Sequence, residues 1–176
     1  MFNSYILTFS KNVISKKPEN IGFSSNNDLK LFDFGLAKDV SHLRCNEKNL
    51  YKLTGNTGSC RYMAPEVAKF ERYNQSVDVY SFSILLWQFF KLTKPYENYT
   101  FNMHQRYVVM EGHRPKVDES WPEAIGAIMK KGWSSEISKR PTAAELLSII
   151  QNHIIELGNE LNDGECSYHA TLFYIE

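Results

Sequence analysis

Residues 17–35 read KPENIGFSSNNDLKLFDFG, and this stretch decides the fold. Two short β-prone runs, at 21–23 and 29–32, flank a polar segment that is typical of a hairpin loop. An antiparallel hairpin brings its open ends together, so we expect the Asn20 amide oxygen and the Asp33 carboxylate to converge. Hard oxygen ligands suit Mg²⁺, which usually takes its other ligands from water and phosphate, so the pair predicts a nucleotide triphosphate site. Taken alone, the pattern is also compatible with a hairpin that has polar ends and no ligand.

The chain beyond Pro65 is predicted to be helical. Residues 76–90 are apolar on nearly every face, which is typical of a helix surrounded by protein. Apolar residues recur at helical spacing from 100 to 111 and stop at Gly112, which predicts a surface helix. His104 is expected to be one of the polar groups on its surface.

Two further helices are predicted from capping patterns at their N-termini. Ser120 with Glu123 is expected to begin a helix that ends near Lys131, and Thr142 with Glu145 to begin the last helix. The segment between residues 35 and 63 is irregular and polar. The predicted fold class is therefore mainly α with a small β-hairpin.

Composition limits the kinds of protein that this chain can be. Its 176 residues with 43% apolar content suit one domain, and 20 basic against 20 acidic residues argue against nucleic acid or an anionic membrane as partners. The most apolar stretch, 77–90, is too short to span a bilayer. Three widely spaced cysteines, Cys45, Cys60 and Cys166, are expected to be reduced thiols in a cytoplasmic, intracellular protein.

Further motifs follow the hairpin, and their order is more specific than any one of them. Together they resemble the C-terminal lobe (C-lobe) of eukaryotic protein kinases, through the motifs Lys17-Pro18-Glu19-Asn20, Asp33-Phe34-Gly35 and Ala64-Pro65-Glu66. The local sequence around Lys17, Ser59 and Trp87 is similar to that of the tyrosine-kinase-like branch of Ser/Thr kinases. The resemblance implies a kinase-like C-lobe at residues 13–156, an unassigned segment at 1–12 and a tail at 157–176.

The resemblance implies roles for the residues of the hairpin and its flanks. Asn20 and Asp33 are expected to hold Mg²⁺ and, through it, ATP, while Lys17 steadies the transferred phosphoryl group. The implied activity is phosphoryl transfer to Ser or Thr of a protein substrate.

The resemblance also implies roles for residues between the hairpin and the last helix. Thr54 and Thr57 would lie in the activation segment and Ser59 in the substrate-docking loop. The remaining residues would be structural, with Glu66 and Arg140 forming a buried ion pair and Asp78 accepting buried hydrogen bonds.

The chain departs from the family pattern where the catalytic aspartate is expected. Val13, Ile14 and Ser15 occupy the His-Arg-Asp positions. Ser15 cannot act as a general base near pH 7, a loss of about a hundred- to ten-thousand-fold in rate. Ile14 cannot pair with a phosphate, so phosphorylation of Thr54 or Thr57 is expected to lack its charge partner.

A second departure is the absence of the nucleotide-binding parts that the family places upstream. No Gly-x-Gly occurs in the sequence, and a strand lysine and a helix glutamate are also expected before the hairpin. The chain alone is therefore predicted to be a kinase fragment that binds ATP poorly and is inactive. A helix that covers residues 77–90 in the family is also absent, which predicts partial exposure of that stretch.

Two other interpretations remain open. The chain could be a pseudokinase-like module that binds a protein partner without catalysis, using the surface around 101–112 and the activation segment. It could also be a non-functional fragment without a stable fold.

Overall fold

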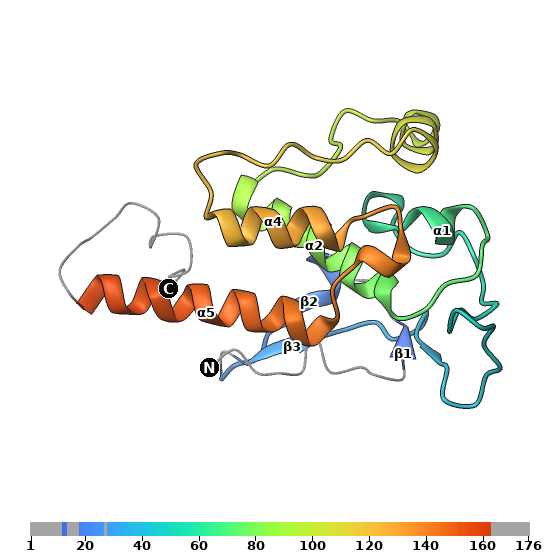
Figure 1. Cartoon of the computed structure of the whole chain (residues 1–176), viewed down its shortest axis with the longest axis horizontal. Coiled ribbons are helices and arrows are strands. Elements are labelled where there is room, and N and C mark those ends of the chain that lie inside the picture. Colours follow the sequence, from blue (N-terminus) through green and yellow to red (C-terminus); the bar gives the residue numbers. More distant parts are fainter. Residues whose placement is uncertain (1–11, 14–17, 27, 163–176) are drawn as a thin grey trace.

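A computed structural model describes residues 12–13, 18–26 and 28–162, and helices dominate it (Figure 1). The strands are β1 Asn12–Val13, β2 Ile21–Phe23, β3 Leu29–Leu31 and β4 Lys38–Asp39. The α-helices are α1 Pro65–Ala68, α2 Ser76–Lys91, α3 Phe101–Met103, α4 Glu123–Gly132 and α5 Ala143–Asn162. Single helical turns form at Pro18–Asn20, Cys60–Tyr62 and Ile137–Lys139, and His104–Met110 is a π-helix. No helix in the described part of the chain is both long and apolar enough to cross a membrane.

Two small antiparallel sheets lie at one side of the helices. The predicted hairpin is confirmed, since β2 pairs with β3 and Ile21 lies opposite Leu31. The Ser24 hydroxyl accepts hydrogen bonds from the main-chain N–H groups at both Asn26 and Asp28, at 3.3 and 3.1 Å, which closes the loop. The second pair, β1 with β4, was not predicted, because strands of two residues are too short to show a periodicity.

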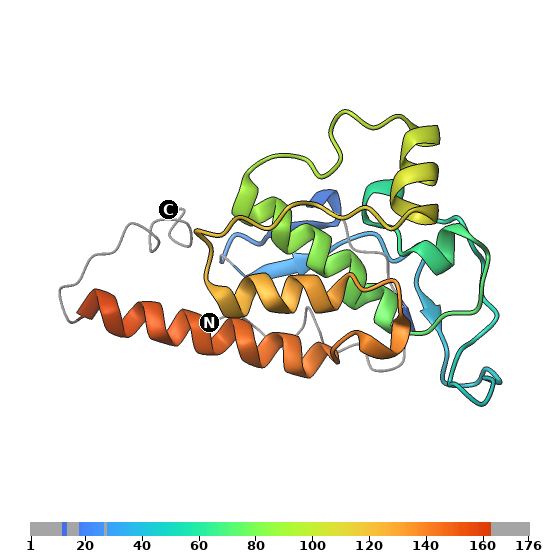
Figure 2. The same ribbon diagram turned by 45° about the horizontal axis from the view of Figure 1, so that its top comes forward.

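Helix α2 is the centre of the molecule, with α4 and α5 packed against it (Figure 2). Tyr80, Ile84 and Leu85 are fully buried, as expected for a helix that is apolar on most faces. The predicted partial exposure of this stretch is found mainly at its C-terminal end, where Phe89 is 48% exposed; from Val77 to Trp87 the residues are buried apart from Phe82, which is partly exposed.

A glycine allows α2 and α4 to approach closely. A Cβ atom added to Gly132 at the end of α4 would lie 2.9 Å from the Ser83 Cβ atom, where a side chain cannot fit. The Ser83 hydroxyl turns back and donates to the Val79 carbonyl at 2.8 Å, so its polar atom is satisfied within α2. The interface between these two helices is consequently tight.

The segment after α2 forms a helix as predicted, but most of it is a π-helix and one face is buried. Thr100 caps its first turn, and Gly112 ends it with a left-handed backbone at φ +76°. Phe101 and Met110 are exposed while Val108 and Val109 are buried, so the segment is a surface helix as predicted, but His104 is buried and its predicted place on the surface is wrong.

His104 is expected to make the protein less stable as the pH falls. Neither ring nitrogen has a hydrogen-bond partner among the described residues. Burial, followed by the nearby guanidinium groups of Arg61 and Arg114, lowers the pKa of His104 from 6.5 to about 4. The unfolded chain therefore binds a proton that the folded chain excludes, so this stability is present above pH 6.5 and is lost as the pH falls towards 4.

The measurement is the melting temperature (Tm) at pH 7 and at pH 5. We expect a decrease of roughly 5 °C for the unmodified chain and a clearly smaller decrease for His104→Leu. The exposed His42 offers a matched control, and His42→Gln should keep the full decrease. An equal decrease in His104→Leu and the unmodified chain would contradict the assignment.

The two predicted helix caps have different outcomes. The cap at Thr142 is confirmed, because the Glu145 N–H donates to the Thr142 hydroxyl at 3.2 Å and the Glu145 carboxylate accepts from Thr142 N–H at 2.7 Å. The cap at Ser120 is wrong, since its hydroxyl donates to Asp118 and the helix starts at Glu123 after a proline. Helix α5 runs on to Asn162, past residue 157 where a tail was expected to begin, and residues 163–176 lie outside the described residues.

Candidate functional site

The open end of the β2–β3 hairpin brings the main chain at Asn20 and Asp33 together. The Phe32 N–H donates to the Asn20 carbonyl at 2.8 Å, which extends the ladder by one residue beyond Ile21 and Leu31. Asp33 comes directly after Phe32. The prediction that both positions lie at one end of the hairpin therefore follows from the register.

The Asp33 backbone has a conformation that is unusual for a residue other than glycine. Its φ of 58° is left-handed, and its carboxylate Oδ1 accepts a hydrogen bond from the Gly35 N–H at 3.2 Å. Aspartate tolerates this conformation better than most residues, and such strain is concentrated at functional sites. The turn projects Asp33 into solvent, where its Oδ2 has no hydrogen-bond partner among the described residues.

The two side chains have the right chemistry for a hard cation. Asn20 is partly exposed, and its side-chain amide makes no hydrogen bond to another described residue. Asp33 and Asn20 can therefore offer one carboxylate and one amide oxygen without losing an existing contact, which fits Mg²⁺. No group of three or more His, Cys, Asp or Glu side chains in the described ranges could hold a metal by itself.

Three of the predicted catalytic positions cannot be placed. Ser15, Lys17 and Ile14 all lie outside the described residues. Their roles stay predictions from the sequence.

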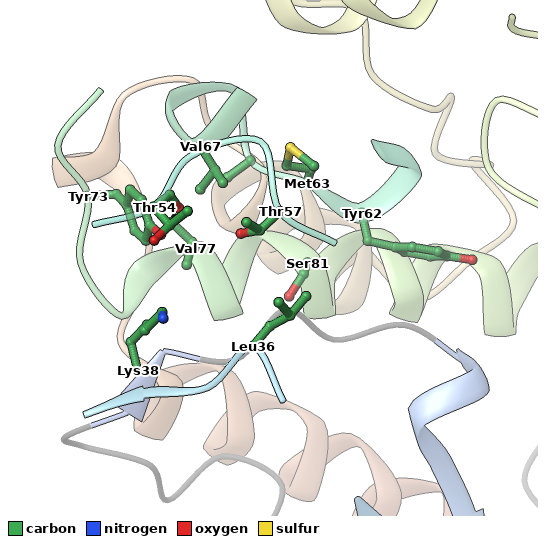
Figure 3. Close-up of a pocket in the computed structure, with 11 residues that line it drawn as sticks. Leu36, Lys38, Thr54, Thr57, Tyr62, Met63, Val67, Tyr73, Val77 and Ser81 are labelled. Atoms are coloured by element: carbon green, nitrogen blue, oxygen red, sulfur yellow. Dashed lines mark hydrogen bonds between the residues drawn. The ribbon is translucent and has the colours of Figure 1, made fainter. Parts of the chain in front are cut away.

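Thr54 and Thr57, which the sequence analysis predicted to lie in an activation segment, line a pocket of about 100 Å³ beside α2 (Figure 3). Thr54 and Thr57 lie on one side of it, and Leu36 and Lys38 lie on the other. The Tyr73 hydroxyl holds the segment by donating to the Thr54 carbonyl at 2.7 Å. Among the described residues that line this pocket, Lys38 alone is charged.

Sequence reasoning missed Lys38, because it considered only Ile14 as the partner of these threonines. The position of Lys38 depends on the pairing of β4 with β1, which no periodicity predicted. The signal in the sequence that could have pointed to Lys38 is its position three residues after Gly35, the last residue of the Asp33-Phe34-Gly35 motif.

Ser59 precedes the helical turn Cys60–Tyr62 and does not line the pocket. Its carbonyl accepts a hydrogen bond from the Tyr62 N–H at 3.2 Å, which starts the turn. The Tyr62 hydroxyl donates to Gln88 Oε1 at 2.5 Å, so the turn is fastened to α2. Burial, with a smaller contribution from the Glu19 carboxylate, raises the pKa of Tyr62 to about 12, so this tyrosine remains protonated at neutral pH.

The expected ion pair between Glu66 and Arg140 is present and almost fully buried. Arg140 Nη1 and Nη2 donate to the two Glu66 carboxylate oxygens at 2.5 and 2.8 Å, and the side chains are 0% and 4% exposed. Arg140 Nε also donates to the Ser134 carbonyl at 2.9 Å, and its guanidinium lies 5.2 Å from the centre of the Tyr80 ring. The pair thus joins α1 to the segment that leads into α5.

Asp78 lies in the first turn of α2 and is 6% exposed. Its negative charge adds to burial in raising the pKa of the neighbouring Tyr73. The burial of Asp78 is as the sequence analysis expected for a structural carboxylate.

Comparison with known proteins gives a consistent family. The chain matches the family model described as protein tyrosine and serine/threonine kinase over residues 10–150. It is 35% identical over 142 residues to the serine/threonine-protein kinase VIK of Arabidopsis thaliana, covering 77% of this chain and 31% of that one. It is 30% identical over 137 residues to the serine/threonine/tyrosine-protein kinase HT1 of the same plant, covering 78% and 33%.

A mammalian kinase is similar over the same region. The chain is 30% identical over 138 residues to mitogen-activated protein kinase kinase kinase 7 of Bos taurus, covering 77% of this chain and 22% of the relative. The chain spans about a third or less of the length of these three relatives. The matched region contains the hairpin, the threonine pocket and the buried ion pair, and the chain belongs to the protein kinase family, in the tyrosine-kinase-like branch.

Proposed function

We propose that this chain is the C-lobe of a kinase that transfers a phosphoryl group from ATP to Ser or Thr of proteins. Asn20 and Asp33 hold Mg²⁺ in this proposal. The observation that supports it is the geometry at the open end of the hairpin. There the Phe32 N–H donates a hydrogen bond to the Asn20 carbonyl, and the next residue, Asp33, is exposed and has a strained backbone.

Asn20 and Asp33 would hold and orient the ion, which would supply positive charge to neutralise phosphate oxygens of the nucleotide. Two protein oxygens leave most of the octahedral ligand positions to water and phosphate, which is the usual arrangement for Mg²⁺. Lys17 is proposed to steady the transferred group, and Ser59 to belong to the loop that receives the substrate hydroxyl.

The same proposal predicts that the 176-residue chain is inactive by itself. A neutral hydroxyl at Ser15 cannot accept the proton of the attacking hydroxyl near pH 7. No Gly-x-Gly occurs in these 176 residues, so the nucleotide affinity of this chain by itself is proposed to be weak.

The test is whether ATP binding depends on magnesium through Asp33. We expect titration of the chain with ATP, followed by NMR or calorimetry, to give a dissociation constant of order 1 mM that weakens about tenfold without Mg²⁺. Asp33→Asn should remove this magnesium dependence, because the amide contributes no negative charge to the metal site.

Asp28 provides the matched control, since it is an exposed aspartate at the closed end of the same hairpin. Asp28→Asn changes the net charge equally and should leave the magnesium dependence intact. Magnesium dependence that survives Asp33→Asn, or that Asp28→Asn removes as well, would overturn the assignment of the metal site.

A further inference from the structure

A groove of about 600 Å³ lies where α2 ends, away from the hairpin and the activation-segment pocket. Its lining comes from the end of α2, from the loop that follows it, and from the extended segment after the π-helix, which lie on one side of the molecule (Figure 2). Three aromatic residues line it, Trp87, Tyr96 and Tyr99. A groove of this size admits several side chains of a peptide.

The loop that forms one wall is held in a strained conformation. Tyr96 has a left-handed φ of 53°, which is rare for a bulky residue. Arg61 Nη1 donates to the carbonyls of Pro95 and Tyr96 at 2.8 and 2.7 Å and so fixes this turn. The Tyr96 and Tyr99 rings lie 5.6 Å apart. The wall is therefore formed before any partner arrives, which reduces the entropy lost on binding.

The opposite wall is equally well fixed. Arg114 donates to the carbonyls of Trp133 and Val108 at 2.8 and 3.0 Å and to the Ser135 hydroxyl at 2.9 Å. The His113 ring stacks on Tyr107 with 5.3 Å between ring centres. These contacts tie the wall that contains His113 and Arg114 to the parts of the chain next to it, and none of them crosses the groove.

The groove has an excess of positive charge. Lys94 and Arg114 line it, and no carboxylate of the described residues lies within ion-pairing distance of either; the lining contains one acid, Glu97. Arg114 donates to neutral oxygens and its guanidinium lies 5.2 Å from the centre of the Tyr80 ring, so no carboxylate of the described residues pairs with it. Lys94 is exposed at the rim. An acidic ligand would therefore meet complementary charge.

We propose that this groove binds an acidic peptide segment of a partner protein, with one aromatic side chain packed against the exposed parts of Tyr96, Tyr99 and Trp87. Aromatic residues with nearby cations are the composition found at the energetic centres of protein interfaces. Carboxylates of the peptide form ion pairs with Lys94 at the rim and are attracted by the positive charge of Arg114. Neither contact uses Asn20 or Asp33, so the groove is independent of phosphoryl transfer.

The test uses the 176-residue chain and two acetylated pentapeptides, each with a central phenylalanine. One peptide has four glutamates around it, and the other has four lysines. Trp87 lines the groove, so a change in the summed fluorescence of the chain's three tryptophans reports occupancy, and neither peptide contains a tryptophan. We expect saturable binding of the acidic peptide only, and affinity about fivefold lower for Lys94→Glu.

Lys130 on the exposed face of α4 is the matched control, because Lys130→Glu makes the same change in net charge away from the groove. It should bind the acidic peptide as the unmodified chain does. Equal binding of the two peptides, no saturation, or equal weakening by both variants would overturn the proposal. Magnesium-dependent ATP binding, measured on the same samples, should not change with Lys94→Glu. The test of the groove can therefore fail or succeed independently of the test of the proposed kinase site.

Discussion

Replacing Arg140 with alanine is expected to lower the free energy of unfolding by about 3–5 kcal/mol. The change leaves the Glu66 carboxylate, which is 4% exposed, buried without its partner. It also removes the hydrogen bonds that Arg140 donates to the carbonyls of Ser134 and Ser76, at 2.9 and 3.3 Å. We expect Tm to fall by about 10 °C.

Chemical denaturation followed by tryptophan fluorescence measures this change. Glu66→Ala should be similarly destabilising, and the double variant should cost much less than the sum of the two, because the second substitution removes an already unpaired charge. Additive costs would show that the two side chains do not act as a pair.

The neighbouring residue gives a matched control. Lys139 is exposed and contacts the Glu136 carboxylate at 2.7 Å. Screening by solvent makes such an exposed pair contribute little. Lys139→Ala should therefore leave Tm nearly unchanged, although the residue is adjacent in sequence to Arg140.

Replacing Ser15 with aspartate is expected to raise the rate of phosphotransfer from Mg-ATP by about a hundred- to ten-thousand-fold. The new carboxylate would accept the proton of the substrate hydroxyl, which serine cannot do near pH 7. Single-turnover transfer to a serine-containing protein, measured at several ATP concentrations, reports this gain even where nucleotide affinity is weak.

Two variants test whether the gain comes from the proposed site. Ser15→Asn has nearly the same shape as Ser15→Asp but no charge, and it should give no gain. Adding Asp33→Ala to Ser15→Asp should abolish the activity, because the metal ligand is lost. No gain with Ser15→Asp would locate the fault in the nucleotide cleft rather than at the base position.

The family and the main elements were predictable because their signals are local. The hairpin at Asn20 and Asp33 follows from two β-prone runs and a polar loop. Helix α2 follows from apolar residues on every face, and the cap at Thr142 from a four-residue pattern. In each case neighbours in sequence make the contacts that define the element.

Other features depend on residues that are distant in sequence, and the sequence did not reveal them. His104 has the polarity of a surface residue, but it is buried, with its ring 5.3 Å from the ring of Tyr96. Lys38 reaches the threonine pocket because β4 pairs with β1. The pattern at Ser120 indicated a helix cap, but the Ser120 hydroxyl donates its hydrogen bond to the Asp118 carboxylate instead.

By itself the sequence determined the kinase family, the order of the helices and the identity of the residues at the hairpin's open end. Periodicity and short motifs carry that information, because it concerns residues that are close along the chain. Only the tertiary structure decided which charges are buried and which surfaces are hollow, as at the groove beside Tyr96 and Arg114. Burial and charge balance arise from contacts between segments that are far apart in the sequence, and no sequence pattern indicates which of these segments will meet.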